Sequence, residues 1–567
     1  MEPDLSTHHP TDSRRWIAFA VVLAAGFMDL LDVTIVNVAV PSIQADLHAE
    51  YSEIEWIVAA YVLAFAAVLI TGGRLGDIFG RKRIFLIGMA GFTLASAACG
   101  LSTDPAMLIA ARFLQGAMAG LMVPQILAII RVTFAEHERA KAIALYSGVG
   151  GSASAVGLSL GGLLVQWDLF DLGWRPIFLV NIPVGILALI AAAMVMKESR
   201  SPAAPRLDVI GMILAIAAVL LLVYPLAEGR RLDWPAWTFV MMAASVTTFG
   251  LFVAYERYRA RTLGSPLVDL ALFRSRPFAI GLGSWLLFWI GLGGFFLVWT
   301  LFMQAGLGWT PMRAGLTAVF FAVGAGIGAG VSVGVLAPRF GRRVLIAGGI
   351  VNAAGFGIYG WLATHYGAGI AAWQMVFPLI VTGAGFGMVV APTIDLLLGQ
   401  VPAKEAGAAS GLLNTGQQLG TALGVALVGV VFFTQLDHDS QRGVDAVTPE
   451  ARAELTMAGL PAQAQDEILA NFRACVRDRS AQVDPTAVPD SCQAPSGPGA
   501  EIVGRVLSAA GTRANAVNFA HTFERTLWYG IGVLALVCLG FLALPRGAKL
   551  EHHEIETDVV GPEPARV

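Results

Sequence analysis

Fourteen long apolar segments restrict what this chain can fold into. Each is close to the roughly 20 residues that a helix needs to cross the hydrocarbon core of a bilayer. The runs are continuously apolar rather than alternating, which excludes a membrane β-barrel. The sequence therefore predicts an all-α integral membrane protein with fourteen transmembrane helices. Their approximate limits are 16–40, 54–73, 84–102, 106–127, 141–165, 177–196, 208–227, 236–255, 277–303, 312–336, 343–363, 371–397, 405–433 and 525–545.

Composition agrees with this class. Of 567 residues, 56% are hydrophobic and 14% are charged, whereas soluble domains carry about a quarter charged residues. The net charge of −3 and the lack of a basic tract give no reason to expect a nucleic-acid partner.

Basic residues indicate the orientation of the helices. Lys and Arg gather in every second loop, as in Arg81-Lys82-Arg83 after the second segment, and such loops face the cytoplasm. Arg230 and Arg231 are a local exception. An even number of spans then puts both termini in the cytoplasm. The predicted location is the cytoplasmic membrane of a bacterium, crossed many times by one chain.

Two hydrophilic stretches interrupt the pattern. Residues 256–276 form a basic cytoplasmic loop, and residues 434–524 form an unusually long external loop. Thr448 and Pro449 have the order of a helix start, and a second amphipathic stretch begins near Glu501. We predict a helical hairpin that lies on the outer face and serves as a passive connection, with a lid as the alternative.

The four cysteines divide between the two environments. Cys99 and Cys538 fall in apolar segments, while Cys475 and Cys492 fall in the external loop. An oxidising compartment would allow the external pair to form a disulfide. No Cys or His pair near them has the spacing of metal ligands, so neither a metal nor a cofactor is expected.

Two carboxylates interrupt the first apolar segment. Asp29 and Asp32 share a helix face because they are three residues apart, and charges at this depth are costly enough to suggest a functional site. Arg112 lies about 9 Å below the outer end of the fourth segment and Asp32 about 10 Å below that of the first, at 1.5 Å per residue. We expect these two to be partners, for proton coupling or as a structural ion pair. Asp29 has no evident partner, and Asp395 is interpreted as a boundary residue at the end of the twelfth segment.

The loop after the second segment carries a pattern of glycines and charges, from Gly73 to Lys82. This pattern resembles the signature loop of the major facilitator superfamily. A degenerate copy runs from Gly334 to Arg343 and has Pro338 at the acidic position. Two copies in corresponding places favour the two-repeat architecture of such transporters. The residues expected to form the cytoplasmic gate are Gly73, Arg74, Gly76, Asp77, Gly80, Arg81 and Lys82.

Further segments resemble the fourteen-span drug:proton antiporter branch of that superfamily. Residues 31–41, 111–116 and 174–185 are similar to its motifs in spans 1, 4 and 6. The span 5 motif of this branch differs in this chain, because Leu158 occupies the position of a family proline that kinks the helix. The antiporter-motif glycines that remain are Gly157, Gly161 and Gly162.

The resemblance implies a major facilitator fold of two six-helix bundles plus two extra central helices. The expected limits are 1–196 for the first bundle, 197–276 for the extra helices and linker, 277–545 for the second bundle, and 546–567 for a disordered cytoplasmic tail. It also implies a monomeric transporter rather than an enzyme, with protons and the lipid bilayer as partners.

By this resemblance, the chain would export amphipathic drugs, antibiotics or toxic metabolites in exchange for protons by alternating access. Asp32 would take and release the proton, Arg112 would modulate it, and Asp29 would assist. A dedicated exporter of one secondary metabolite or lipid is the alternative, and a membrane sensor or enzyme is a third.

Aromatic and amide side chains are the candidates for a substrate cavity, since they suit bulky amphipathic compounds, including cations. Lipid-facing aromatics and contacts between helices are the alternative interpretation. The candidates are Gln115, Trp285, Trp289, Phe296, Asn414, Gln417 and Gln418.

Overall fold

The computed structural model describes residues 13–49, 51–134, 136–200, 208–229, 232, 234–262, 266–268, 270–399, 401, 406–481, 489–492 and 500–544. Arg230, Arg231 and the predicted tail at 546–567 lie outside the described residues. The part of the chain that is described folds into helices without strands, which confirms the predicted all-α class.

The first group of helices comes from the N-terminal third of the chain. They are α1 (Ser13–Leu47), α2 (Tyr51–Phe79), α3 (Arg81–Gly100), α4 (Pro105–Thr133), α5 (Glu136–Trp167), the short η1 (Leu169–Asp171), α6 (Pro176–Leu179) and α7 (Asn181–Val195). Two additional helices follow, α8 (Val209–Glu228) and α9 (Ala236–Thr262).

The second group begins after the linker and the short η2 (Leu270–Arg274). It consists of α10 (Arg276–Leu301), η3 (Phe302–Gly306), α11 (Pro311–Val331), η4 (Ser332–Leu336), α12 (Ala337–Phe340), α13 (Arg343–Tyr366), η5 (Gly367–Gly369), η6 (Ala372–Met375), α14 (Val376–Gly399), α15 (Ala406–His438), α16 (Ser440–Met457), α17 (Ala462–Ala481), η8 (Asp490–Cys492) and α18 (Ala500–Leu542).

Thirteen helices among the described residues are long and apolar enough to cross a membrane. The fifth predicted segment corresponds to α5, which has 32 residues and is not among those thirteen. It packs against α1 on one side and α11 on the other. It therefore lies where the two groups of helices meet.

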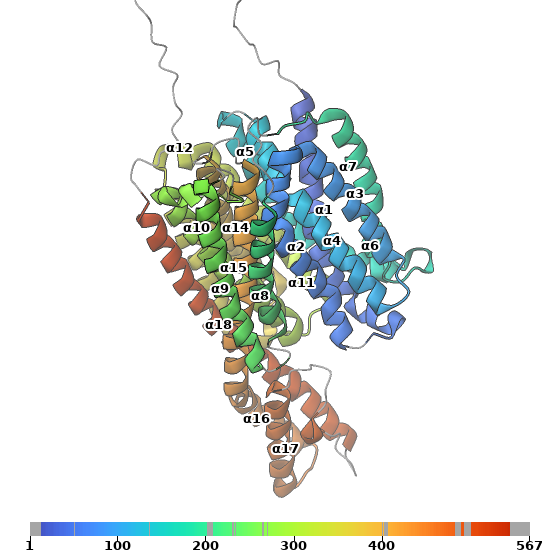
Figure 1. Ribbon diagram of the computed structural model, residues 1–567. Coiled ribbons are helices and arrows are strands. Elements are labelled where there is room, and N and C mark those ends of the chain that lie inside the picture. Colours follow the sequence, from blue (N-terminus) through green and yellow to red (C-terminus); the bar gives the residue numbers. More distant parts are fainter. Residues whose placement is uncertain are drawn as a thin grey trace, which may run out of the picture.

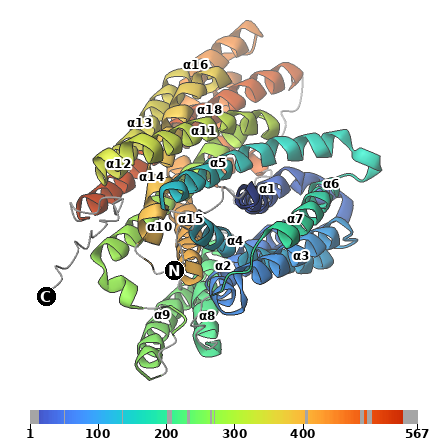
Figure 2. The same cartoon turned by 90° about the horizontal axis from the view of Figure 1, so that it is seen from above.

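The two groups form two bundles side by side (Figures 1 and 2). The α5–α11 contact joins the bundles on one side, and α2 packs against α15 on the other. Helix α8 contacts both α2 and α15, and α9 packs on α8. The additional helices thus cover one side of the junction, as Figure 2 shows.

Close helix crossings depend on glycine. A Cβ on Gly116 of α4 would overlap the backbone of Tyr61 in α2, and one on Gly383 of α14 would overlap the backbone of Phe321 in α11. Small residues allow membrane helices to approach until their backbones touch. The crossing at Gly116 sets the positions of the side chains on α2 and α4 that form the polar site described below.

A three-helix unit projects from the end of the molecule opposite the start of α1 (Figure 1). It consists of α16, α17 and the first half of α18, and it has its own apolar core. That core contains Val444, Val447, Ala451, Leu455, Leu469, Phe472, Val503, Val506, Ala510 and Ala514. Cys475 and Cys492 are joined by a disulfide within this unit, with their Cα atoms 4.7 Å apart.

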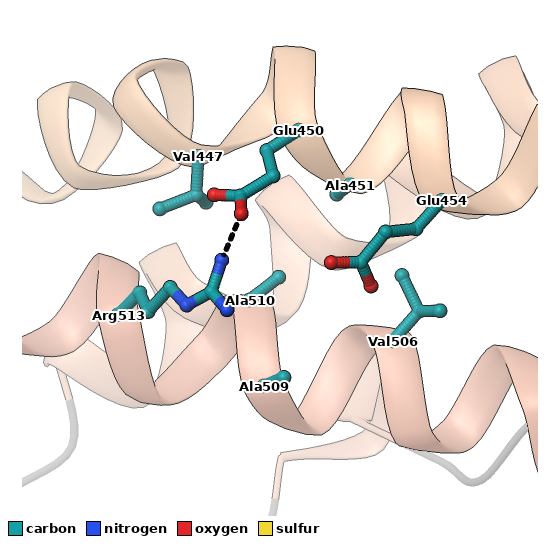
Figure 3. Close-up of a pocket in the computed structure, with 8 residues that line it drawn as sticks. All are labelled: Val447, Glu450, Ala451, Glu454, Val506, Ala509, Ala510 and Arg513. Atoms are coloured by element: carbon teal, nitrogen blue, oxygen red, sulfur yellow. Dashed lines mark ion pairs between the residues drawn. The ribbon is translucent and has the colours of Figure 1, made fainter.

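An ion pair also holds the unit together. Arg513 of α18 lies 2.5 Å from Glu450 of α16 beside a small pocket that Val447 and Val506 help to line (Figure 3). In the loop closed by the disulfide, a hydrogen bond from Ser491 lowers the pKa of the Asp478 carboxyl, and neighbouring Arg477 acts in the same direction. The carboxylate form of Asp478 is therefore favoured at neutral pH.

The predicted helix start at Thr448 and Pro449 is wrong. Helix α16 begins at Ser440, and Pro449 lies inside it. Proline removes one backbone hydrogen bond, while Val447 and Leu455 still bury the apolar face of the helix. A packed unit of three helices takes the place of the predicted hairpin on the outer face, because α18 extends out of the bundle as one continuous helix.

We predict that Leu455→Ala loosens the three-helix unit of α16, α17 and α18 and leaves the two helix bundles folded. Leu455 is 0% exposed, and truncating such a side chain costs about 2–5 kcal/mol. Limited proteolysis of the purified protein should cut between residues 440 and 524 faster in the variant. The matched control is Met457→Ala, because Met457 is 80% exposed on the same helix. Equal cleavage rates for the two variants would contradict the assignment of the core.

Candidate functional site

Asp32 lies in α1 and is completely buried, at 0% exposed. Its Oδ2 accepts a hydrogen bond from Arg112 Nη1 at 2.5 Å. Its Oδ1 accepts from Gln115 Nε2 at 2.8 Å and from Asn181 Nδ2 at 3.1 Å. The carboxylate is therefore surrounded by donors from α4 and α7, and the two charges predicted to be partners are in contact.

Arg112 is held on several sides. Its Nε donates to the carbonyl oxygen of Ile57 at 3.2 Å, and its Nη1 also donates to Gln115 Oε1 at 2.8 Å. Its guanidinium carbon lies 4.3 Å from the centroid of the Tyr61 ring, a cation–π distance. The close approach of α2 and α4 at Gly116 makes these contacts possible.

Ser96 of α3 completes the network. Its hydroxyl accepts from Asn181 Nδ2 at 2.9 Å and from Gln115 Nε2 at 3.2 Å, and it donates to the carbonyl oxygen of Phe178 at 3.0 Å. Helices α1, α3, α4 and α7 thus converge on one carboxylate. Sequence reasoning assigned no role to Ser96 or Asn181, although Asn181 lies in the motif at 174–185.

Asp29 lies about one turn from Asp32 on α1 and is 4% exposed. The hydroxyl of Tyr61 donates to its Oδ1 at 2.5 Å. Because the Tyr61 ring also contacts Arg112, one tyrosine joins the two acidic positions. The partner of Asp29 was not evident from the sequence, since Tyr61 is one of many aromatic residues in apolar segments.

The acidic groups of this site outnumber its basic group. Asp29 and Asp32 supply two carboxyl groups, and Arg112 supplies one permanent positive charge. Asp29 contacts a neutral hydroxyl, whereas Asp32 contacts the guanidinium. The site can therefore accommodate one further positive charge, which a proton or a cationic group would supply.

The predicted gate motif forms a tight corner between α2 and α3. Arg81 Nη2 donates to Asp77 Oδ1 at 2.7 Å, and Asp77 is 0% exposed. Gly80 has φ +108°, a backbone conformation that favours glycine. Side-chain atoms of Gln125 fill the space beside Gly76, and the neighbouring Gly73 is buried.

The motif is attached to two other parts of the chain. Lys82 Nζ donates to the carbonyl oxygens of Ala193 and Met196 at 2.7 Å, at the end of α7. Arg74 Nη2 donates to the carbonyl oxygen of Pro266 at 2.6 Å. The corner is therefore tied to the first bundle and to the linker that follows α9.

Polar contacts join the two bundles at the ends that the orientation rule assigns to the cytoplasm. Arg139 Nε of α5 donates to Asp395 Oδ1 of α14 at 2.9 Å, and both side chains are buried. Ser410 Oγ of α15 donates to the carbonyl oxygen of Pro124 at 2.8 Å. The interpretation of Asp395 as a boundary residue is wrong, because this acid is buried in an ion pair between the bundles.

The antiporter-motif glycines lie where α5 crosses α1. A Cβ on Gly157 would overlap the Thr34 hydroxyl, and one on Gly161 would lie 2.8 Å from Ile35 Cγ1, while Gly162 is half-buried. Helix α5 continues through position 158 without interruption.

The predicted cavity residues differ in their surroundings. Trp285 is 2% exposed, and its Nε1 donates to the carbonyl oxygen of Leu413 at 3.0 Å. Trp289 packs edge-on against Trp285 with ring centroids 5.6 Å apart. Its buried Nε1 has no hydrogen-bond partner among the described residues. These indoles form an aromatic wall in the second bundle.

The remaining candidates lie in three places. Asn414 Nδ2 donates to the carbonyl oxygen of Ser410 at 2.9 Å, while Gln417 and Gln418 are partly buried further along α15. Phe296 packs against Phe321 of α11. Gln115 belongs to the Asp32 network instead of the aromatic wall.

Known proteins are similar to this chain over most of its length. The protein-family model described as "Major Facilitator Superfamily" matches residues 22–425 of this chain. The "Probable actinorhodin transporter" of Streptomyces coelicolor is 40% identical over 531 residues, covering 93% of this chain and 91% of that protein. The "Tetracenomycin C resistance and export protein" of Streptomyces glaucescens is 36% identical, covering 77% and 80%.

A solved structure shows the same fold. The human organic anion transporter MFSD10 (TETRAN) superposes with a TM-score of 0.54 at 16% identity, covering 74% of this chain and 94% of that one.

We predict that Arg112→Leu strongly destabilises the protein and that adding Asp32→Asn restores much of the loss. Removing one partner of a buried ion pair leaves an uncompensated charge, at a cost of about 3–5 kcal/mol. Neutralising Asp32 removes that charge. The measurement is the thermal unfolding midpoint of the single and double variants in detergent. A double variant no more stable than Arg112→Leu alone would contradict this account of the network.

Proposed function

This chain belongs to the major facilitator superfamily and is a multi-pass membrane transporter, and we propose that it exports amphipathic small molecules in exchange for protons. The observation that carries the proposal is the buried network in which two carboxyl groups face one arginine. Fixed charges of this kind are costly in a membrane and mark proton or substrate pathways. The proposed orientation has both termini in the cytoplasm, and the proposed unit is a monomer.

Asp32 is the proposed main proton carrier. When it is ionised, it holds Arg112, Gln115 and Asn181 in one network. A proton on its carboxyl group removes the charge that Arg112 balances and loosens the attachment of α1 to α4 and α7. Releasing the proton re-forms the network, so the protonation state is linked to the positions of these helices.

Asp29 is proposed to assist through Tyr61. The tyrosine hydroxyl contacts Asp29 while its ring contacts Arg112, so a movement of Arg112 is transmitted to Asp29. The one positive charge that the site lacks can be supplied at either acid.

The cytoplasmic gate is proposed to consist of the signature motif and the Arg139–Asp395 ion pair. The ion pair connects the two bundles on that side, and alternating access requires the contact to break when the cytoplasmic side opens. Arg81 and Asp77 keep the adjacent corner of α2 and α3 rigid, so that each bundle moves as a unit.

The proposed substrates are amphipathic aromatic compounds of the antibiotic type, and the proposed role is drug resistance. The aromatic wall of Trp285 and Trp289 suits such compounds. The relatives described above are named as a probable actinorhodin transporter and as a tetracenomycin C resistance and export protein. A dedicated exporter of one metabolite is the second candidate, because the relative that covers 93% of this chain is named for a single compound. A transport panel of chemically unrelated drugs separates broad from dedicated export.

We predict that Asp32→Asn abolishes uphill, proton-driven efflux and that Asp29→Asn reduces it. The amide keeps the size of the carboxyl group but carries no exchangeable charge. The measurement is substrate transport in proteoliposomes with an imposed pH gradient. Uphill efflux by Asp32→Asn would show that the proton is carried elsewhere.

The matched control is Asp46→Asn, since Asp46 lies on the same helix near its predicted outer end. Hydrogen bonds from Trp174 and Arg175 lower the pKa of the Asp46 carboxyl, so it stays ionised at neutral pH. It is expected to retain transport.

We also predict that Asp395→Arg opens the cytoplasmic side and that Arg139→Asp in the same chain restores closure. Two arginines facing each other repel, whereas the exchanged pair attracts. A single cysteine placed near Ser410 should react faster with a membrane-impermeant thiol reagent, applied from the cytoplasmic side, in the single variant. Equal labelling in the single variant and the unmutated protein would refute the gate assignment.

A further inference from the structure

A second group of buried charges lies at the predicted cytoplasmic end of the two additional helices, outside the Asp32 network. Asp208 precedes α8 and Glu256 lies in the last part of α9, and they are 1% and 0% exposed. Arg259 Nε lies 3.1 Å from Asp208 Oδ2. Two buried carboxyl groups and one arginine are therefore present here, on elements that the proposed transport mechanism does not use.

One oxygen of each carboxyl group accepts a hydrogen bond from a backbone N–H. Asp208 Oδ1 accepts from the backbone N–H of Gly211 at 2.8 Å, which caps α8. Glu256 Oε2 accepts from the backbone N–H of Val268 at 3.1 Å. Glu256 Oε1 is buried without a hydrogen-bond partner among the described residues, whereas Asp208 Oδ2 faces Arg259 Nε at 3.1 Å. Each carboxyl group thus turns one oxygen away from its backbone partner.

These two oxygens are neighbours. Asp208 Oδ2 lies 2.6 Å and Glu256 Oε1 lies 2.5 Å from the position that a Cβ on Gly211 would occupy, so both border the same small space. Two carboxyl groups can hydrogen-bond directly only when one of them carries a proton. Both groups ionised at this distance would also repel each other in a buried site.

We propose that Asp208 and Glu256 form a proton-binding site, a carboxylic acid–carboxylate pair that shares one proton. The shared proton supplies the missing donor, and Arg259 balances the charge that remains. A metal ion fits less well, because the described residues contain no group of three or more His, Cys, Asp or Glu side chains that could hold one. The site therefore takes a single proton as its ligand.

Hydrogen bonds connect the pair to the proposed gate motif. Glu256 binds Val268 in the linker, and two residues earlier Pro266 accepts the hydrogen bond from Arg74 of the signature motif. Arg259 of α9 contacts Asp208 directly, and Arg74 of α2 is connected to the pair through the linker. Ile70, Phe252 and Leu267 pack together in one apolar cluster with Val268 of the linker. Losing the proton changes the charge on the group that holds the linker, so the site senses proton activity on the predicted cytoplasmic side.

The test is infrared spectroscopy of the full-length protein in lipid nanodiscs, which detects the C=O stretch of protonated carboxyl groups. The unmutated protein should show a protonated carboxyl at neutral pH that disappears as the pH rises. Glu256→Gln and Asp208→Asn should each lose this component, because either amide supplies the donor that the proton provided and leaves the other group ionised. The matched control is Glu228→Gln, since Glu228 is 2% exposed at the other end of α8 and its removal should leave the component unchanged.

The results of this test are independent of the transport assays, because the infrared signal is measured without substrate and without a pH gradient. Persistence of the component in either Glu256→Gln or Asp208→Asn overturns the shared proton. If a variant does not fold, the infrared spectrum of the unmutated protein still tests the proposal. The absence of any protonated carboxyl at neutral pH in that spectrum overturns it. Failure of Asp32→Asn to abolish uphill efflux would refute the transport mechanism and leave this site untouched.

Discussion

The buried contact between Asp32 and Arg112 is the interaction on which the rest of the first bundle depends. Neither charge is tolerable alone at that depth, and the pair is stable only if its remaining donors and acceptors are satisfied. Gln115, Asn181 and Ser96 meet that requirement from three helices. The glycine crossing at Gly116 follows from the same need, because it brings α4 close enough to α2 for Arg112 to reach the carbonyl of Ile57.

The two bundles divide the chemistry between them. The first holds the charged network, and the second presents indole and amide groups on α10 and α15. A transporter that binds a bulky substrate on an aromatic surface and a proton on a carboxylate can couple them through movement of one bundle against the other, without direct contact. In the proposed mechanism, the Arg139–Asp395 ion pair lies at the boundary where the bundles move, and its strength would affect how readily the predicted cytoplasmic side opens.

What the sequence predicted depends on the kind of interaction. The apolar segments follow from length and composition, and the Asp32–Arg112 contact follows from equal depth, since two opposite charges in a membrane seek each other. The partners Tyr61 and Ser96 were not predictable, because a hydroxyl in an apolar segment is common and its direction depends on the packing of other helices. Asp395 was misjudged since its partner lies 256 positions away in the sequence. Pro449 was misjudged since the apolar face of α16, with Val447 and Leu455, packs in the core on either side of the proline.

The additional helices gain a physical role from where they pack. Helix α8 touches both α2 and α15, so any rocking of the bundles must slide one of them along it. A rigid attachment to both bundles would oppose that motion. The hydrogen bonds of the linker at Pro266 and Val268 connect α9 to the signature motif on the first bundle. The Asp208–Glu256 pair lies at that attachment. The proposed proton site is therefore located where α9 is attached to the first bundle, which also carries Asp32. In the proposed mechanism, the Asp208–Glu256 pair and the Asp32 network move together with that bundle.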